Sequence, residues 1–184
     1  TAKRPLLDVF NLVIWVMCVA GLRLNEVFRP FIELLPVVSG SGKIKEPERW
    51  VLQIGTSKQK ELRTLKWTGS EPEGSTLKRS REKPLAFGAH FTRLEQVVNI
   101  IRTYAAQHLK ERFPDREYGD YTALELTAFF GQNVNRRMQR AFRDQALHAR
   151  AKGIPFGSHW NRALYANVAF DQFSDSLDHI SKPG

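Results

Sequence analysis

The stretch Gly157-Ser-His-Trp-Asn-Arg-Ala-Leu-Tyr-Ala-Asn167 belongs to a segment, residues 158–170, whose pattern predicts a helix. Residues three apart on a helix share a face, so His159 and Arg162 would direct two cationic donor groups at one point. Such a pair suits the oxygens of a phosphate group. The pair His-x-x-Arg is common by chance, so its meaning depends on the rest of the chain.

A second basic signature, Ala20-Gly-Leu-Arg-Leu-Asn-Glu-Val27, lies near the start of the chain. Residues 5–22 predict a buried helix that Gly21 ends, and residues 23–28 predict a short helix after it. Arg23 falls between the two. We interpret Glu26 as a capping or orienting residue, and a plain Arg23–Glu26 ion pair is the alternative to a functional Arg23.

The composition indicates one folded domain over residues 1–184 with a polyanionic partner. Hydrophobic residues make up 42% of the chain, and 28 Lys and Arg against 19 Asp and Glu leave a net charge of +9. A basic balance of this size favours a polyanionic partner, nucleic acid first. The single cysteine excludes a disulfide framework, and the apolar run at residues 9–22 is too short to span a bilayer. We therefore expect a cytoplasmic, nucleoid-associated protein.

The remaining pattern predicts a mainly α fold with a small antiparallel sheet, an α+β arrangement. Residues 50–54 read as a strand, residues 62–67 as a returning strand, and the stretch from Thr68 to Lys83 as an exposed loop insertion. Capping boxes at Thr92 and Thr122 open two helices, and residues 133–148 form a further one.

These segments together resemble the catalytic domain of the tyrosine recombinases, the DNA breaking-rejoining superfamily that includes phage integrases. The stretch at residues 20–27 is similar to the family's first box, Thr-Gly-Leu-Arg-x-x-Glu-Leu, and the stretch at residues 157–167 to its second, Thr-Pro-His-x-Leu-Arg-His-Thr-Phe-Ala-Thr. Gln53-Ile-Gly-Thr-Ser-Lys58 resembles the strand that ends in the family's hairpin lysine, and Val134-Asn-Arg-Arg-Met-Gln-Arg-Ala141 the helix before the second box. A Ser-His-x-x-Arg second box and a long insertion also fit the telomere resolvase (protelomerase) branch.

The resemblance implies strand cleavage and rejoining through a 3′-phosphotyrosyl intermediate, as in recombination, integration or telomere resolution. Arg23 and Arg162 would grip the phosphate, and His159 would hydrogen-bond it or handle the proton of the attacking group. Lys58 would protonate the departing 5′ oxygen, with Lys60 as the alternative. No metal or cofactor is implied. The partner that the resemblance implies is double-stranded DNA, and self-association on DNA is expected.

A further basic set occupies one face of the predicted helix at residues 133–148. Arg136, Arg140 and Arg143 recur at helical spacing, which suits contacts with the DNA backbone, as does Lys60 in the polar turn. A solvated basic face is the alternative interpretation.

The family's nucleophilic tyrosine has no counterpart in the sequence. The tyrosines are Tyr104, Tyr118, Tyr121 and Tyr165, and Tyr165 aligns with an aromatic residue expected to pack inward. His179 would belong to a third box only if that box comes early. We therefore expect a catalytic-core fragment that binds DNA without cleaving it, a tyrosine supplied in trans, or a non-catalytic DNA-binding protein on the same fold.

Overall fold

The computed structural model of the protein describes residues 8–30, 32–36, 49–54 and 83–180. This part is mainly helical, which confirms that aspect of the predicted fold class. Its α-helices are α1 (Val9–Ala20), α2 (Leu24–Phe28), α4 (Phe91–Arg112), α5 (Ala123–Ala141), α6 (Arg143–Ala151) and α7 (Ser158–Ile180). The other elements are the strands β1 (Ile32–Pro36), β2 (Arg49–Ile54) and β3 (Lys83–Pro84) and the 3-10 turns η2 (Ala86–Gly88) and η3 (Tyr118–Asp120).

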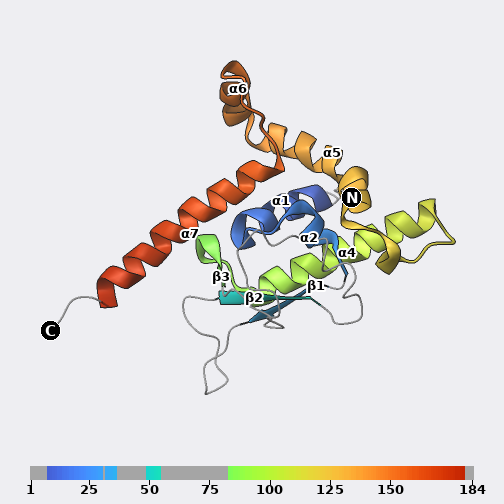
Figure 1. The fold of residues 1–184 in the computed structure, drawn as a ribbon, viewed down its shortest axis with the longest axis horizontal. Coiled ribbons are helices and arrows are strands. Elements are labelled where there is room, and N and C mark those ends of the chain that lie inside the picture. Colours follow the sequence, from blue (N-terminus) through green and yellow to red (C-terminus); the bar gives the residue numbers. More distant parts are fainter. Residues whose placement is uncertain (1–7, 31, 37–48, 55–82, 181–184) are drawn as a thin grey trace, which may run out of the picture.

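Helix α1 lies at the centre of the fold and packs against α4, α5 and α7 (Figure 1). Its buried residues are Val9, Val13, Ile14, Val16, Met17, Val19 and Ala20. A helix that is apolar on most sides is one that other elements surround. The Asp8 carboxylate caps its first turn by accepting from the backbone N–H of Phe10 at 3.1 Å, and it also pairs with Arg137 of α5. Elements from both ends of the chain therefore pack on α1.

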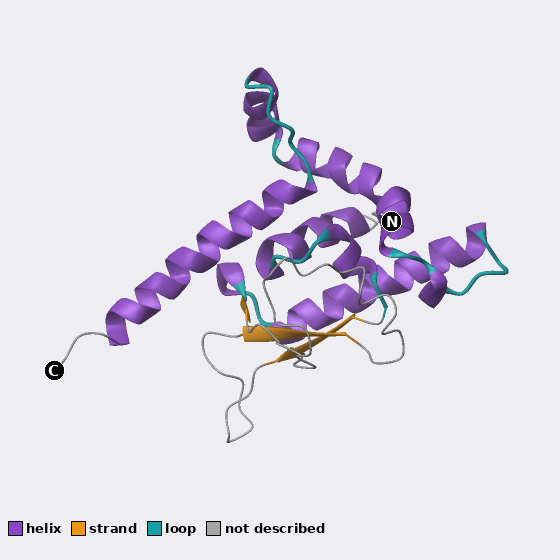
Figure 2. Ribbon diagram, in the orientation of Figure 1, coloured by secondary structure: helices purple, strands orange, loops and turns teal. Residues whose placement is uncertain are grey.

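The strands lie together on one side of the helices (Figure 2). They pair in the order β1-β2-β3, and both pairings are antiparallel. Ile32 lies opposite Ile54, and Trp50 lies opposite both Pro36 and Lys83. The strand predicted at residues 50–54 corresponds to β2, whereas β1 was not predicted. The returning strand predicted at residues 62–67 lies outside the described residues. The predicted loop insertion also lies outside them, except for its last residue, Lys83, which begins β3.

Helix α4 carries the apolar face that its sequence predicts, because Leu94, Val97, Val98 and Ile101 are all buried. Its first residue is Phe91, with His90 as the N-cap, so the predicted capping box at Thr92 is wrong. Phe91 is buried, and its packing in the core extends the helix past Thr92.

Helix α5 confirms one predicted capping box and corrects one predicted boundary. Thr122 Oγ1 accepts from the N–H of Glu125 at 3.3 Å, and the Glu125 carboxylate accepts from the N–H of Thr122 at 2.8 Å. The separate helix predicted at residues 133–148 is wrong, because α5 continues through this region to Ala141 and α6 begins after Phe142. Phe142 is not helical (φ −118°, ψ 51°), and its ring packs on Trp160 with centroids 5.0 Å apart.

Candidate functional site

The turn between α1 and α2 brings Arg23 to the N-terminus of α2. Gly21 makes this turn with φ +62°, a left-handed conformation that glycine adopts readily. A Cβ at Gly21 would overlap the ring of Tyr165, so α7 closes directly over the turn. The glycine therefore serves both the backbone turn and the approach of α7.

Arg23 is exposed, and its guanidinium makes no ion pair among the residues that the structure describes. The Glu26 carboxylate accepts from the backbone N–H of Arg23 at 2.7 Å, so it caps α2, as predicted for Glu26. At the other end of α2, Arg102 of α4 donates from Nε to the carbonyl oxygen of Val27 at 3.2 Å. Both ends of α2 are thus held, while the Arg23 head group faces solvent.

The N-terminus of α7 presents His159 and Arg162. The backbone N–H of Ser158 donates to Asn135 Oδ1 of α5 at 3.2 Å, which satisfies one of the free donors at the helix start. Asn161, which lies between His159 and Arg162 in sequence, is fully buried and donates from Nδ2 to the Met138 sulfur at 3.3 Å. With Asn161 turned into the core, His159 is exposed and Arg162 is half-buried.

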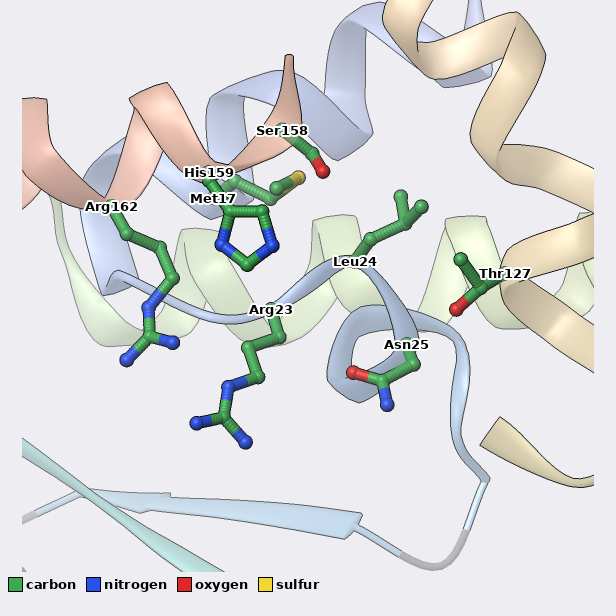
Figure 3. A pocket seen from close by; sticks show the side chains of 8 residues that line it. All are labelled: Met17, Arg23, Leu24, Asn25, Thr127, Ser158, His159 and Arg162. Atoms are coloured by element: carbon green, nitrogen blue, oxygen red, sulfur yellow. The ribbon is translucent and has the colours of Figure 1, made fainter. Parts of the chain in front are cut away.

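Arg23, His159 and Arg162 line one open pocket of about 220 Å³ (Figure 3). The remaining lining residues are Met17, Leu24, Asn25, Thr127 and Ser158. None of the described residues that line the pocket is a carboxylate, so the charge of this lining is positive. The structure thus brings together three of the four predicted catalytic residues from opposite ends of the chain. Such a site attracts an anion with several acceptor oxygens.

The fourth predicted catalytic residue, Lys58, and the predicted DNA-binding residue Lys60 lie outside the described residues. The other predicted DNA-binding residues, Arg136, Arg140 and Arg143, line a second hollow together with Gln139. This hollow lies where α5 meets α6, and its lining shares no residue with the first pocket. The structure therefore groups the predicted basic residues into two separate sets.

The tyrosines are not arranged as nucleophiles at this pocket, because none of them lines it. The Tyr165 hydroxyl donates to the carbonyl oxygen of Pro84 at 2.9 Å, and burial raises the pKa of Tyr165 to about 12. The inward packing predicted for Tyr165 is confirmed. The Tyr118 hydroxyl donates to the carbonyl oxygen of Phe28, and burial raises its pKa. Tyr121 is buried, and Tyr104 stacks on His108.

Three polar residues of the pocket were missed from the sequence: Asn25, Thr127 and Ser158. Asn25 and Ser158 fall inside the two boxes, where proximity to Arg23 and His159 could have marked them. Thr127 carries no such signal, because only the packing of α5 on α2 brings it to the pocket.

The described residues contain no group of three or more His, Cys, Asp or Glu placed to hold a metal ion. None of the described helices has the length and hydropathy of a membrane-spanning segment. Comparisons of the chain with protein-family models, with curated proteins and with solved structures found no match.

Proposed function

We propose that the pocket formed by Arg23, His159 and Arg162 binds a phosphodiester of DNA, in a catalytic domain of the tyrosine recombinase type. The proposal is carried by the convergence of these three side chains on one pocket, whose described lining residues include no carboxylate. The sequence resemblance assigns phosphate binding to the same three residues. The net charge of +9 also favours a polyanionic partner.

The chemistry of the three side chains fits phosphoryl transfer. A five-coordinate phosphorus gathers negative charge on its non-bridging oxygens, and guanidinium groups held in place stabilise that charge. Arg23 and Arg162 stand on different elements, so they can approach the phosphate from two directions. His159 can hydrogen-bond the same oxygens or exchange a proton with the attacking hydroxyl.

In the proposed reaction a tyrosine oxygen attacks the phosphorus, and the bond to the 5′ oxygen breaks. The 5′ oxygen leaves with a proton, for which the resemblance proposes Lys58 as donor, and a 5′-hydroxyl later reverses the step. The described tyrosines point into the core or along α4, so the nucleophile of this scheme is a tyrosine in a longer form of the chain or in a second protomer.

A non-catalytic DNA-binding protein on the same fold is the second candidate. It is favoured by Tyr118 and Tyr165, whose hydroxyls are hydrogen-bonded to backbone carbonyl oxygens, and by the lining of the pocket, which includes no tyrosine of this sequence. Both candidates require the pocket to bind DNA and differ only in whether a covalent bond forms.

Binding to a fluorescent duplex, followed by anisotropy, tests what the two candidates share. Arg23→Ala and Arg162→Ala should each weaken binding by about tenfold, the order expected for charged hydrogen bonds to phosphate. Arg93→Ala is the matched control, because Arg93 is exposed on α4 and does not line the pocket. Equal affinities for all four proteins would remove the pocket from the DNA interface.

A covalent adduct separates the candidates. The protein translated from the complete reading frame is incubated with duplex DNA that carries a nick close to the cleavage site. After cleavage, the short fragment with the freed 5′-hydroxyl can diffuse away, so the strand cannot be rejoined. A recombinase accumulates a tyrosine-linked adduct, detected by denaturing electrophoresis and peptide mass spectrometry, and Arg162→Ala abolishes it. Pocket-dependent binding without any adduct would establish the binding protein instead.

A further inference from the structure

The pocket has two sides of different chemistry. In Figure 3, Arg162 and His159 occupy one side, Asn25 and Thr127 the other, and Arg23 lies between them. The first side is cationic. The second holds the Asn25 amide and the Thr127 hydroxyl, with the side chain of Leu24 beside them, and the Ser158 hydroxyl also lines the pocket.

The hydrogen bonds of the neutral side limit what it can accept. The Thr127 hydroxyl donates its proton to the carbonyl oxygen of Ala123 at 2.9 Å, so it offers only lone pairs to the pocket. The Asn25 amide makes no hydrogen bond among the residues that the structure describes, so its donors and its acceptor are both available. Lone pairs repel a phosphate oxygen and attract an N–H or O–H group. A second phosphate is therefore a poor occupant at Thr127, whereas the Asn25 amide can donate to a ligand oxygen or accept from a ligand N–H.

The size of the pocket also exceeds one phosphate. At about 30 Å³ for each water in the liquid, 220 Å³ corresponds to roughly seven waters, against five heavy atoms in a phosphate group. By the same measure, an anion held by Arg23 and Arg162 leaves room for about two more heavy atoms, so only the polar edge of a neutral group attached to it enters the pocket.

We propose that the neutral side of the pocket binds the nucleoside attached to the phosphate, with Asn25 and Thr127 as its hydrogen-bonding residues. This inference rests on the proposed function, which supplies the phosphodiester. The ligand of the whole pocket is then a nucleotide unit. Its anionic group lies on Arg23, His159 and Arg162. A base N–H donates to Thr127 Oγ1, and Leu24 packs on the apolar part of the nucleoside.

Two probes separate the sides of the pocket. Dimethyl phosphate carries a phosphodiester without a nucleoside, and thymidylyl(3′–5′)thymidine carries the same group with one on each side. Each is titrated into the isotope-labelled chain at millimolar concentration while the backbone amide resonances of pocket residues are followed by NMR. The dinucleotide should bind about three- to tenfold more tightly, as expected from one or two net hydrogen bonds.

Substitutions then assign that advantage to the two polar residues. Thr127→Val and Asn25→Ala should reduce the dinucleotide to the affinity of dimethyl phosphate and leave dimethyl phosphate binding unchanged. Thr127→Ser keeps the hydroxyl and should keep the advantage. Thr103→Val and Asn99→Ala, both at exposed positions of α4, are the matched controls.

The outcomes distinguish this inference from the function on which it rests. Equal affinity for the two probes, or an advantage that Thr127→Val and Asn25→Ala leave intact, overturns the nucleoside side while the phosphate site stands. Binding of either probe that survives Arg23→Ala combined with Arg162→Ala overturns the phosphate site itself. Failure of both probes to shift the pocket resonances overturns both proposals.

Discussion

Asn161 illustrates how one residue can oppose the stability of the core around it. It is fully buried between α1 and α5, its Nδ2 donates to a methionine sulfur, and its Oδ1 has no hydrogen-bond partner among the described residues. A thioether is a weak acceptor, and an unsatisfied buried carbonyl oxygen costs about 1–3 kcal/mol. Asn161 therefore places a polar side chain at a buried position where an apolar side chain would be more stable.

We expect Asn161→Leu to stabilise the protein. Leucine has a similar size and removes the unsatisfied oxygen, so the free energy of unfolding should rise by about 1–3 kcal/mol, less any cost of repacking. At roughly 2–4 °C per kcal/mol for a domain of this size, calorimetry should detect the shift in Tm. Asn167→Leu, at an exposed position of the same helix, is the control. A Tm at or below that of the control would contradict the argument.

At the scale of elements, the N-terminus of α5 depends on an ionised carboxylate. The Arg116 guanidinium donates to both oxygens of Glu125, at 2.7 and 3.0 Å, and Thr122 donates from its backbone N–H and its hydroxyl. These bonds, that from Arg116 first, lower the pKa of Glu125 to about 2. They join the loop before α5 to the helix and hold its first turn.

The stability of wild type relative to Glu125→Gln should therefore depend on pH. A carboxyl whose pKa is lower in the folded state stabilises the protein above its unfolded pKa of about 4.5 and loses that effect as the pH falls toward 2. Urea unfolding at several pH values should show wild type more stable at pH 7 and the difference shrinking below about pH 4.5. Glu95→Gln, exposed on α4, is the control. A difference that is constant with pH would mean that the carboxylate does not cap the helix.

Elements were predictable from the sequence where their signals are local. Thr122 with Glu125 and the apolar face at Leu94 to Ile101 depend on residues within one or two turns, and both predictions are confirmed. The break at Phe142 and the start of α4 at Phe91 depend on packing against distant residues. Trp160, on which Phe142 packs, is far from it in sequence. A helix prediction that uses only sequence neighbours therefore does not detect this contact, and the helix was predicted to continue through Phe142.

At the scale of the whole molecule, the candidate site also combines residues that the sequence predicted with residues that only tertiary packing brings to it. Two sequence boxes named Arg23, His159 and Arg162, but their meeting depends on α7 packing over Gly21 and α1. Asn25 and Thr127 join them only through the packing of α2 on α5. The charged residues of the pocket belong to recognisable sequence motifs, whereas the contribution of Asn25 and Thr127 can be recognised only from the packing of the helices.

The junction of α5 and α6 extends the basic surface away from the pocket. Helix α6 buries none of its residues and projects from the body of the molecule (Figure 1). Its first residue, Arg143, is exposed, as are Arg136 and Arg140 of α5. A nine-residue helix without a buried face gains little from the core, which leaves its basic surface available for a partner. The three arginines line one hollow at this junction, which suits contacts with phosphates of a DNA backbone.

We predict that these arginines contribute to DNA affinity mainly through counterion release. The slope of log K for association against log salt is negative. Each Arg→Ala substitution that removes one phosphate contact should reduce the magnitude of this slope by about 0.9, equally for unrelated duplex sequences, and the triple variant should reduce it by roughly three times as much. Anisotropy titrations over a range of salt concentrations measure the slope, with Arg93→Ala as the control. The pocket should respond differently, because Arg162→Ala also weakens the binding of a single phosphodiester, which the triple variant leaves unchanged. An unaltered slope in the triple variant would show that the α5–α6 surface is a solvated basic face.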